Sequence, residues 1–186
     1  MRRTLRALAV VVTTCMAFGV FAGTALARLD GGNRLDVEIR DECDPATFNA
    51  VLGDGACVGD GTVTFSDFIA ELAATQQVAT WRFDPRLARV EQGEKIVARN
   101  VGGETHTFTE VAEFGPGIVP ELNELVFGVP GPPLPEFENL GPDDFIAPGG
   151  TVKLRTGKKG LDPGLHRFEC AIHPWMQATV EIEGDD

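Results

Sequence analysis

"GLHRFECAIHPWMQATVEI", residues 164–182, has the pattern of two short strands joined by a tight loop. The loop contains Cys170, His173 and Met176, each three residues from the next. A thiolate, an imidazole and a thioether are soft or borderline ligands, and together they suit copper in both of its common oxidation states. The loop therefore predicts three ligands to one metal ion.

The fourth ligand has to come from elsewhere in a chain that has only three histidines. His166 lies four residues before Cys170 in the same predicted strand, which separates the two by about 13 Å. That distance is too long for one shared ion. His106 follows the Gly102-Gly103 pair, and glycine lets a backbone approach a site closely. We therefore predict that His106 completes the site.

Zinc is the main alternative metal, because one cysteine and two histidines with an open position would suit a catalytic zinc ion. Met176 argues against zinc, since a thioether is a soft ligand. Calcium was considered at residues 59–69, which resemble half of an EF-hand loop. The first two ligand positions there would be Ala56 and Val58, which cannot bind calcium. Copper is therefore the predicted metal.

Residues 1–27 have the pattern of a signal peptide: a basic start, an uncharged apolar run, and "ALA" at 25–27. We predict cleavage after Ala27 and a periplasmic or secreted protein without a membrane anchor. An uncleaved anchor is the alternative, and the pattern leaves open whether export uses the general or the twin-arginine route. The net charge of −12 argues against a nucleic-acid partner and favours basic ones.

Export to an oxidising compartment favours a disulfide. Cys43 and Cys57 lie close in sequence and flank a helix-like stretch, so we expect these two to pair. Cleavage after Ala27 would remove Cys15, so Cys170 then remains as the free thiol of the mature chain, and metal ligation would protect it.

The pattern divides the mature chain into residues 28–76, an N-terminal extension, and residues 77–186, a β-rich domain. The extension has a strand-like "LDVEI" at 35–39 and two helix patterns, one starting at Asp44 and Pro45 and the other at Thr64. The domain alternates with period two in six short stretches, at residues 78–83, 95–100, 105–111, 151–155, 165–170 and 178–182. A proline-rich insert at 111–147 interrupts them, with one short helix expected at 119–126.

The stretches "NVGGETHTF", "APGGTVKLRT", "GLHRFECAIHPWM" and "ATVEI" together resemble the blue-copper cupredoxins, which include plastocyanin and amicyanin. That family commonly has an Asn six residues before its first histidine ligand, as Asn100 precedes His106 here. His166 stands where the family usually has an aromatic residue. The resemblance implies a mainly β, cupredoxin-like Greek-key β-sandwich for residues 77–186, with a small, partly helical extension before it.

The resemblance also implies roles for the site residues. Cys170 would be the thiolate of a single type 1 copper, with a hydrogen bond from the backbone N–H of Thr107. His173 would be the ligand at the solvent edge, and Trp175 beside it a possible docking contact. Pro174 fixes the backbone after His173 and would help to keep the loop rigid.

The predicted function is that of a soluble, monomeric electron carrier whose partner is a redox protein, for example a c-type cytochrome with a basic patch. A copper-handling protein that stores, delivers or senses the ion is the alternative. An enzyme is not expected, because multicopper enzymes need further histidine-rich sites and the chain has three histidines in all.

Overall fold

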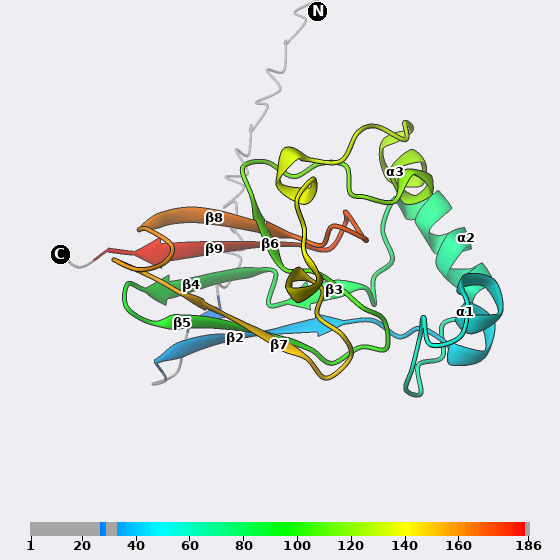
Figure 1. Ribbon diagram of the computed structural model, residues 1–186, viewed down its shortest axis with the longest axis horizontal. Coiled ribbons are helices and arrows are strands. Elements are labelled where there is room, and N and C mark those ends of the chain that lie inside the picture. Colours follow the sequence, from blue (N-terminus) through cyan, green and yellow to red (C-terminus); the bar gives the residue numbers. More distant parts are fainter. Residues whose placement is uncertain (1–26, 29–32, 185–186) are drawn as a thin grey trace, which may run out of the picture.

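The computed structural model describes residues 27–28 and 33–184, so the predicted signal peptide lies outside it except for Ala27 (Figure 1). Within that part of the chain, two mixed sheets have the strand orders β1-β4-β9-β8-β6 and β3-β2-β5-β7. The strands are β1 (Ala27–Arg28), β2 (Arg34–Arg40), β3 (Arg82–Asp84), β4 (Leu87–Glu91), β5 (Lys95–Asn100), β6 (Thr109–Val111), β7 (Thr151–Arg155), β8 (Gly164–Glu169) and β9 (Gln177–Glu183).

The two sheets enclose the core because alternate side chains of each strand point inward. In β2 these are Leu35, Val37 and Ile39, and β9 contributes Val180 and Ile182 from the other sheet. Each is at most 3% exposed. The predicted fold class, a mainly β sandwich, is confirmed.

Three strands differ from the sequence analysis, and the shortest of them is β1, a two-residue strand that was not predicted. β2 runs parallel to β5 over six residue pairs, so it belongs to the sandwich, whereas the predicted boundary at residue 76 places it in the extension. β4 was not among the predicted strands, although it pairs in parallel with β9. Parallel partners lie far apart in sequence, so the local alternation on which the prediction relied does not reveal them.

Three helices gather at one end of the sandwich, beyond the turn between β8 and β9 (Figure 1). They are α1 (Pro45–Leu52), α2 (Phe65–Thr75) and α3 (Pro120–Phe127), and all three were expected. The side chain of Asp44 caps α1 and that of Thr64 caps α2. Each cap satisfies backbone N–H groups that a first helical turn leaves free.

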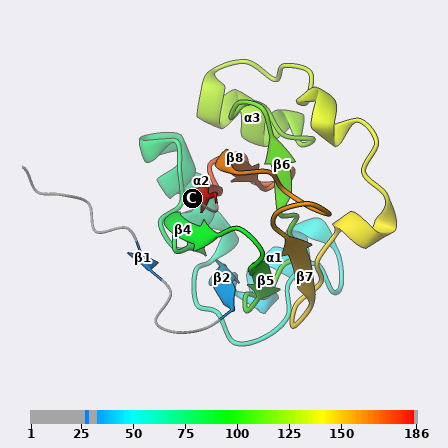
Figure 2. The same cartoon turned by 90° about the vertical axis from the view of Figure 1, so that its left-hand side faces the viewer.

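The insert leads from β6 in one sheet around the flank of the sandwich to β7 in the other (Figure 2). It holds α3 and two short 3-10 helices, η1 (Pro135–Phe137) and η2 (Pro142–Asp144). The buried side chain of Asn123 ties it together through hydrogen bonds to Gly117 and Pro130. In the described residues, no helix is long and apolar enough to cross a membrane.

Candidate metal centre

The turn between β8 and β9 carries three of the four predicted ligands, Cys170, His173 and Met176. The backbone N–H of Cys170 donates to the carbonyl of Met176 at 3.1 Å, and that of Met176 donates to the carbonyl of His173 at 2.8 Å. The side chain of Gln177 also donates to the carbonyl of Pro174 at 2.7 Å. These bonds close the loop tightly and hold the thiol and the imidazole on the same side of it.

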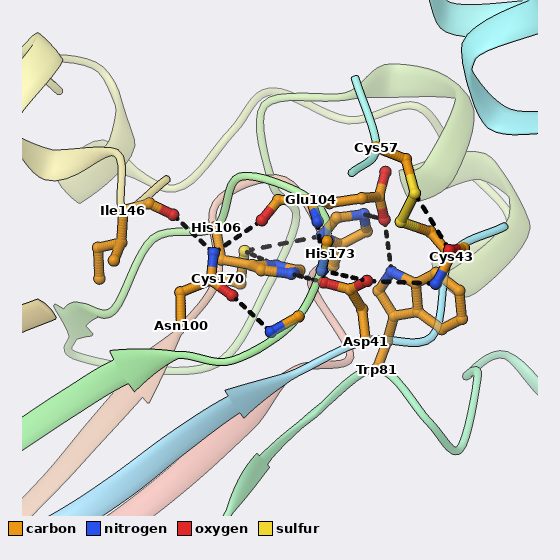
Figure 3. Close-up of polar contacts among 12 residues, drawn as sticks. Asp41, Cys43, Cys57, Trp81, Asn100, Glu104, His106, Ile146, Cys170 and His173 are labelled. Atoms are coloured by element: carbon orange, nitrogen blue, oxygen red, sulfur yellow. Dashed lines mark hydrogen bonds and ion pairs between the residues drawn. A yellow bond between two sulfur atoms is a disulfide. The ribbon is translucent and has the colours of Figure 1, made fainter. Parts of the chain in front are cut away.

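The segment between β5 and β6 carries the remaining predicted ligand, His106. Backbone hydrogen bonds join His106 to Ile146 in both directions. The fully buried side chain of Asn100 donates to the carbonyls of Glu104 and Ile146, and it accepts from the N–H of Gly102. Asn100 thus fixes the loop before His106 (Figure 3).

The three side chains meet in the interior (Figure 3). Nδ1 of His106 lies 3.7 Å from Sγ of Cys170, and Nδ1 of His173 lies 3.9 Å from the same sulfur. All three candidate ligand atoms are within 4.8 Å of one another. The backbone N–H of Thr107 donates to the sulfur at 3.4 Å, and the Thr107 hydroxyl accepts from the N–H of Ala171.

This donor set fits one copper ion. Two atoms that each lie about 2.0–2.3 Å from a shared ion can be at most about 4.5 Å apart, a limit that both sulfur–nitrogen distances respect. A thiolate with two imidazoles is also the combination that copper prefers. Met176, at the end of the loop, is fully buried, and its role as axial ligand stays a prediction.

Each imidazole turns its other nitrogen toward a buried carboxylate, which the sequence analysis did not foresee. Nε2 of His106 lies 2.8 Å from Oδ2 of Asp41. Nε2 of His173 lies 3.6 Å from Oε2 of Glu104, which accepts a hydrogen bond of 2.6 Å from Nε1 of Trp81. Carboxylates in such positions orient ligating imidazoles and make them more basic.

Electrostatics in the metal-free cluster favour a thiolate. Burial raises the pKa of Cys170, but hydrogen bonds with His106 and His173 outweigh burial and hold it well below its usual range. Burial lowers the pKa of His106, yet Asp41 and the Cys170 thiolate raise it to about 9. Burial also opposes ionisation of Asp41, but His106 and two backbone N–H groups lower its pKa to about 2. The sulfur is therefore already in the form that binds metal.

The predicted disulfide between Cys43 and Cys57 is confirmed, with the two Cα atoms 6.2 Å apart. It joins the segments that carry the two carboxylates. The N–H of Cys43 donates to Asp41, and Cys57 forms a β-bridge with Glu104. A Cβ atom at Gly102 would overlap the Asp41 carboxylate, which explains the close approach that glycine permits there.

The structure corrects two expectations about exposure. His173 was expected at the solvent edge but is only 4% exposed, and the docking candidate Trp175 is only 6% exposed. Phe68 of α2 packs against both rings, with centroids 6.3 Å from that of His173 and 5.8 Å from that of Trp175. The helices of the N-terminal segment therefore cover the edge of the site that the resemblance leaves open.

His166 lies apart from the cluster, as the strand spacing predicts. Its Nδ1 is 2.5 Å from Oε1 of Glu110, and its Nε2 is 2.7 Å from the carbonyl of Asp162.

Comparisons with known proteins give a likeness at the level of structure. No family model and no curated protein matches the chain. An oxidised plastocyanin from Dryopteris crassirhizoma aligns with 80% of this chain and 100% of its own, at 18% identity and a TM-score of 0.40. A purple cupredoxin from Nitrosopumilus maritimus aligns with 57% of this chain and 86% of its own, at 12% identity and a TM-score of 0.39.

A reduced Cu(I) form of an amicyanin mutant aligns with 57% of this chain and 78% of its own, at 18% identity and a TM-score of 0.37. Identities and TM-scores this low do not establish a metal centre. The candidate site therefore depends on its own residues and distances.

Proposed function

We propose that the chain is an exported, monomeric protein that binds one type 1 copper ion and carries single electrons. His106, Cys170 and His173 would hold the ion, with Met176 as a weak axial ligand. When bound, copper would supply a one-electron couple between Cu(I) and Cu(II). The observation that carries the proposal is the buried cluster of one sulfur and two Nδ1 atoms.

The chain's own residues support electron transfer rather than metal release. The hydrogen bond from Thr107 stabilises negative charge on the Cys170 sulfur, and the Asp41 carboxylate holds the His106 ring in place. Backbone bonds on both sides fix the loop and the His106 segment. A site held this firmly would change little between oxidation states, which favours fast electron transfer.

The partner we propose is a redox protein with a basic patch, such as a c-type cytochrome. The chain has 28 acidic and 16 basic residues, so a basic partner would be attracted at low ionic strength. Because α2 covers His173, this partner would meet the helical end of the sandwich rather than an exposed imidazole. We do not propose an enzymatic activity.

A visible absorption spectrum of the copper-loaded protein tests the proposal. An intense band near the red end of the visible range is expected, and Cys170→Ser should abolish it while the far-ultraviolet circular dichroism stays unchanged. The control is Glu138→Gln, at an exposed position of the insert, which should keep the band. A colourless wild-type protein would refute the copper assignment.

A second measurement separates the carrier from the copper-handling alternative. A carrier should show a reversible positive potential and should keep its copper in the presence of a chelator. A protein that delivers copper should lose the ion to the same chelator within minutes, and that result would favour the alternative.

A further inference from the structure

A cavity of about 320 Å³ lies among α1, α2, α3 and the turn after β8. Its walls are mainly apolar and include Phe48, Phe65, Phe68, Leu122 and Leu125. Sites for small molecules commonly begin at about this volume and are lined in this way, with a few polar groups that orient the ligand. The proposed electron carrier makes no use of this space.

Two buried polar groups line the cavity, Glu104 and His173. Nε2 of His173 and Oε2 of Glu104 are 3.6 Å apart, which is too long for a direct hydrogen bond. Oε2 of Glu104 already accepts a hydrogen bond from Trp81, whereas Oε1 accepts none from the described part of the chain. A carboxylate that is 93% buried therefore keeps an unused acceptor beside an unused ring nitrogen.

This pair has the form of a receptor for a hydroxyl group. A ring that binds metal through Nδ1 carries its proton on Nε2, so His173 can donate. Glu104 can accept. A hydroxyl oxygen between them would accept from the imidazole and donate to the carboxylate, which satisfies both groups at once. A group that can only accept would leave the buried carboxylate unsatisfied, at a cost of about 1–3 kcal/mol or more.

The residues that line the cavity indicate which kind of chemical group should carry the hydroxyl. Three phenylalanine rings surround the space, and Phe48 packs edge-on against Phe65 and Phe68 with centroids 5.2 and 5.5 Å apart. Further aromatic rings pack well against such edges and faces. Glu104 and Glu121 both line the cavity, and the chain is strongly acidic, so a negatively charged ligand would be repelled.

We propose that this cavity binds a small, neutral aromatic alcohol, with its hydroxyl between Glu104 and His173 and its rings among the phenylalanines. The site goes beyond the proposed electron transfer, and it depends on the proposed metal only in that the metal on Nδ1 would keep the proton of His173 on Nε2. It also gives the N-terminal helices a second task, because α1 and α2 supply most of the aromatic wall. Leu52, which also lines the cavity, is 54% exposed.

Binding of 1-naphthol to the full chain, followed by the naphthol's own fluorescence, tests the proposal with and without added copper. The comparison compounds are 1-methoxynaphthalene, which cannot donate a hydrogen bond, and 1-naphthoate, which is negatively charged. We expect 1-naphthol to bind at least about tenfold more tightly than either, because one hydrogen bond to a charged group is worth that factor or more.

Three variants locate the site. Leu122→Trp fills the cavity and should weaken 1-naphthol binding about tenfold or more. Phe127→Trp, on an exposed position of the same helix, should leave binding unchanged. Glu104→Gln should bring the affinities for 1-naphthol and 1-methoxynaphthalene close together, since it removes the charged acceptor.

The proposal is overturned if wild-type protein binds neither compound, binds both equally, or if Leu122→Trp binds 1-naphthol as well as wild type does. Equal binding would mean that only water bridges the polar pair. The readout is the fluorescence of 1-naphthol and not the visible band of copper, so failure of this proposal and failure of the copper assignment are distinguishable.

Discussion

Replacing Glu169 by glutamine should make the protein more stable at alkaline pH and leave its stability near pH 4.5 unchanged. Glu169 is fully buried next to Cys170. Its Oε2 accepts from the N–H of Gly115 and the amide of Gln177, while Oε1 has no hydrogen-bond partner in the described residues. Burial, reinforced by the Cys170 thiolate and Glu136, raises its pKa to about 8.

The sign and size of this effect on the free energy of unfolding follow from the protonation of Glu169 in the folded and in the unfolded chain. Below about pH 4.5 the carboxyl is protonated whether the chain is folded or unfolded. Between about pH 4.5 and about pH 8 only the unfolded chain releases the proton, so the free energy of unfolding falls as the pH rises. One pKa unit is worth 1.36 kcal/mol, so the loss reaches about 3 kcal/mol at pH 7 and about 5 kcal/mol at pH 9.

Urea unfolding of the metal-free protein at several pH values provides the assay. Glutamine keeps the shape of a protonated glutamate and the acceptor for Gly115. We therefore expect Glu169→Gln to match wild type near pH 4.5 and to be more stable by several kcal/mol near pH 8.5. The raised pKa of His106 also makes the stability depend on pH in this window, so the difference between variant and wild type is the quantity to follow.

The matched control is Glu138→Gln, the same substitution at an exposed position of the insert, which should track wild type throughout. A Glu169→Gln curve parallel to that of wild type would refute the reasoning. It would mean that Glu169 ionises in the folded protein as readily as in the unfolded chain.

Three further predictions concern the metal centre and its support. Asp41→Asn should weaken copper binding about 10–100-fold and raise the reduction potential, because a less basic His106 stabilises Cu(II) less. Asp36→Asn, on the exposed face of β2, is the control. An unchanged copper affinity of Asp41→Asn would count against the role of Asp41. Met176→Gln should lower the potential, since an amide oxygen favours Cu(II), and an unchanged potential would mean that Met176 is not axial. Cys43→Ser with Cys57→Ser should cost about 3 kcal/mol of unfolding free energy, measured in urea at pH 7, and no loss would mean that helix packing alone holds the segment.

Features with a local signal could be predicted from the sequence. Asp44, Pro45 and Thr64 mark helix starts because capping is settled within one turn. The spacing of Cys170 and His173 places both in one loop, and strand geometry alone separates His166 from them. The disulfide between Cys43 and Cys57 was predicted from their short separation in sequence and from the expected oxidising compartment, and the structure confirms that pair.

The contacts that could not be predicted join residues far apart in sequence. Asp41 reaches His106 across 65 positions, and nothing around "RDECDP" distinguishes its carboxylate from exposed ones. The Asp–Glu-rich composition hides such a residue among 28 acids. The contact between Phe68 and His173 could not be predicted for the same reason. Phe68 fits the apolar face of α2 whether or not it packs against an imidazole.

The positions of the cysteines along the chain bear on how the protein matures. If the chain is exported as proposed, and by the general route, its N-terminal part emerges first, so Cys43 and Cys57 would reach the oxidising side well before Cys170 does. They are separated by 14 positions, and short loops close more readily than long ones. The correct disulfide can therefore form while the third thiol is still absent. Cys170 arrives later, next to a sheet whose other strands have already emerged, and β9 then buries it. In a chain exported this way, the order of residues would keep the metal-binding thiol apart from Cys43 and Cys57 until those two have paired.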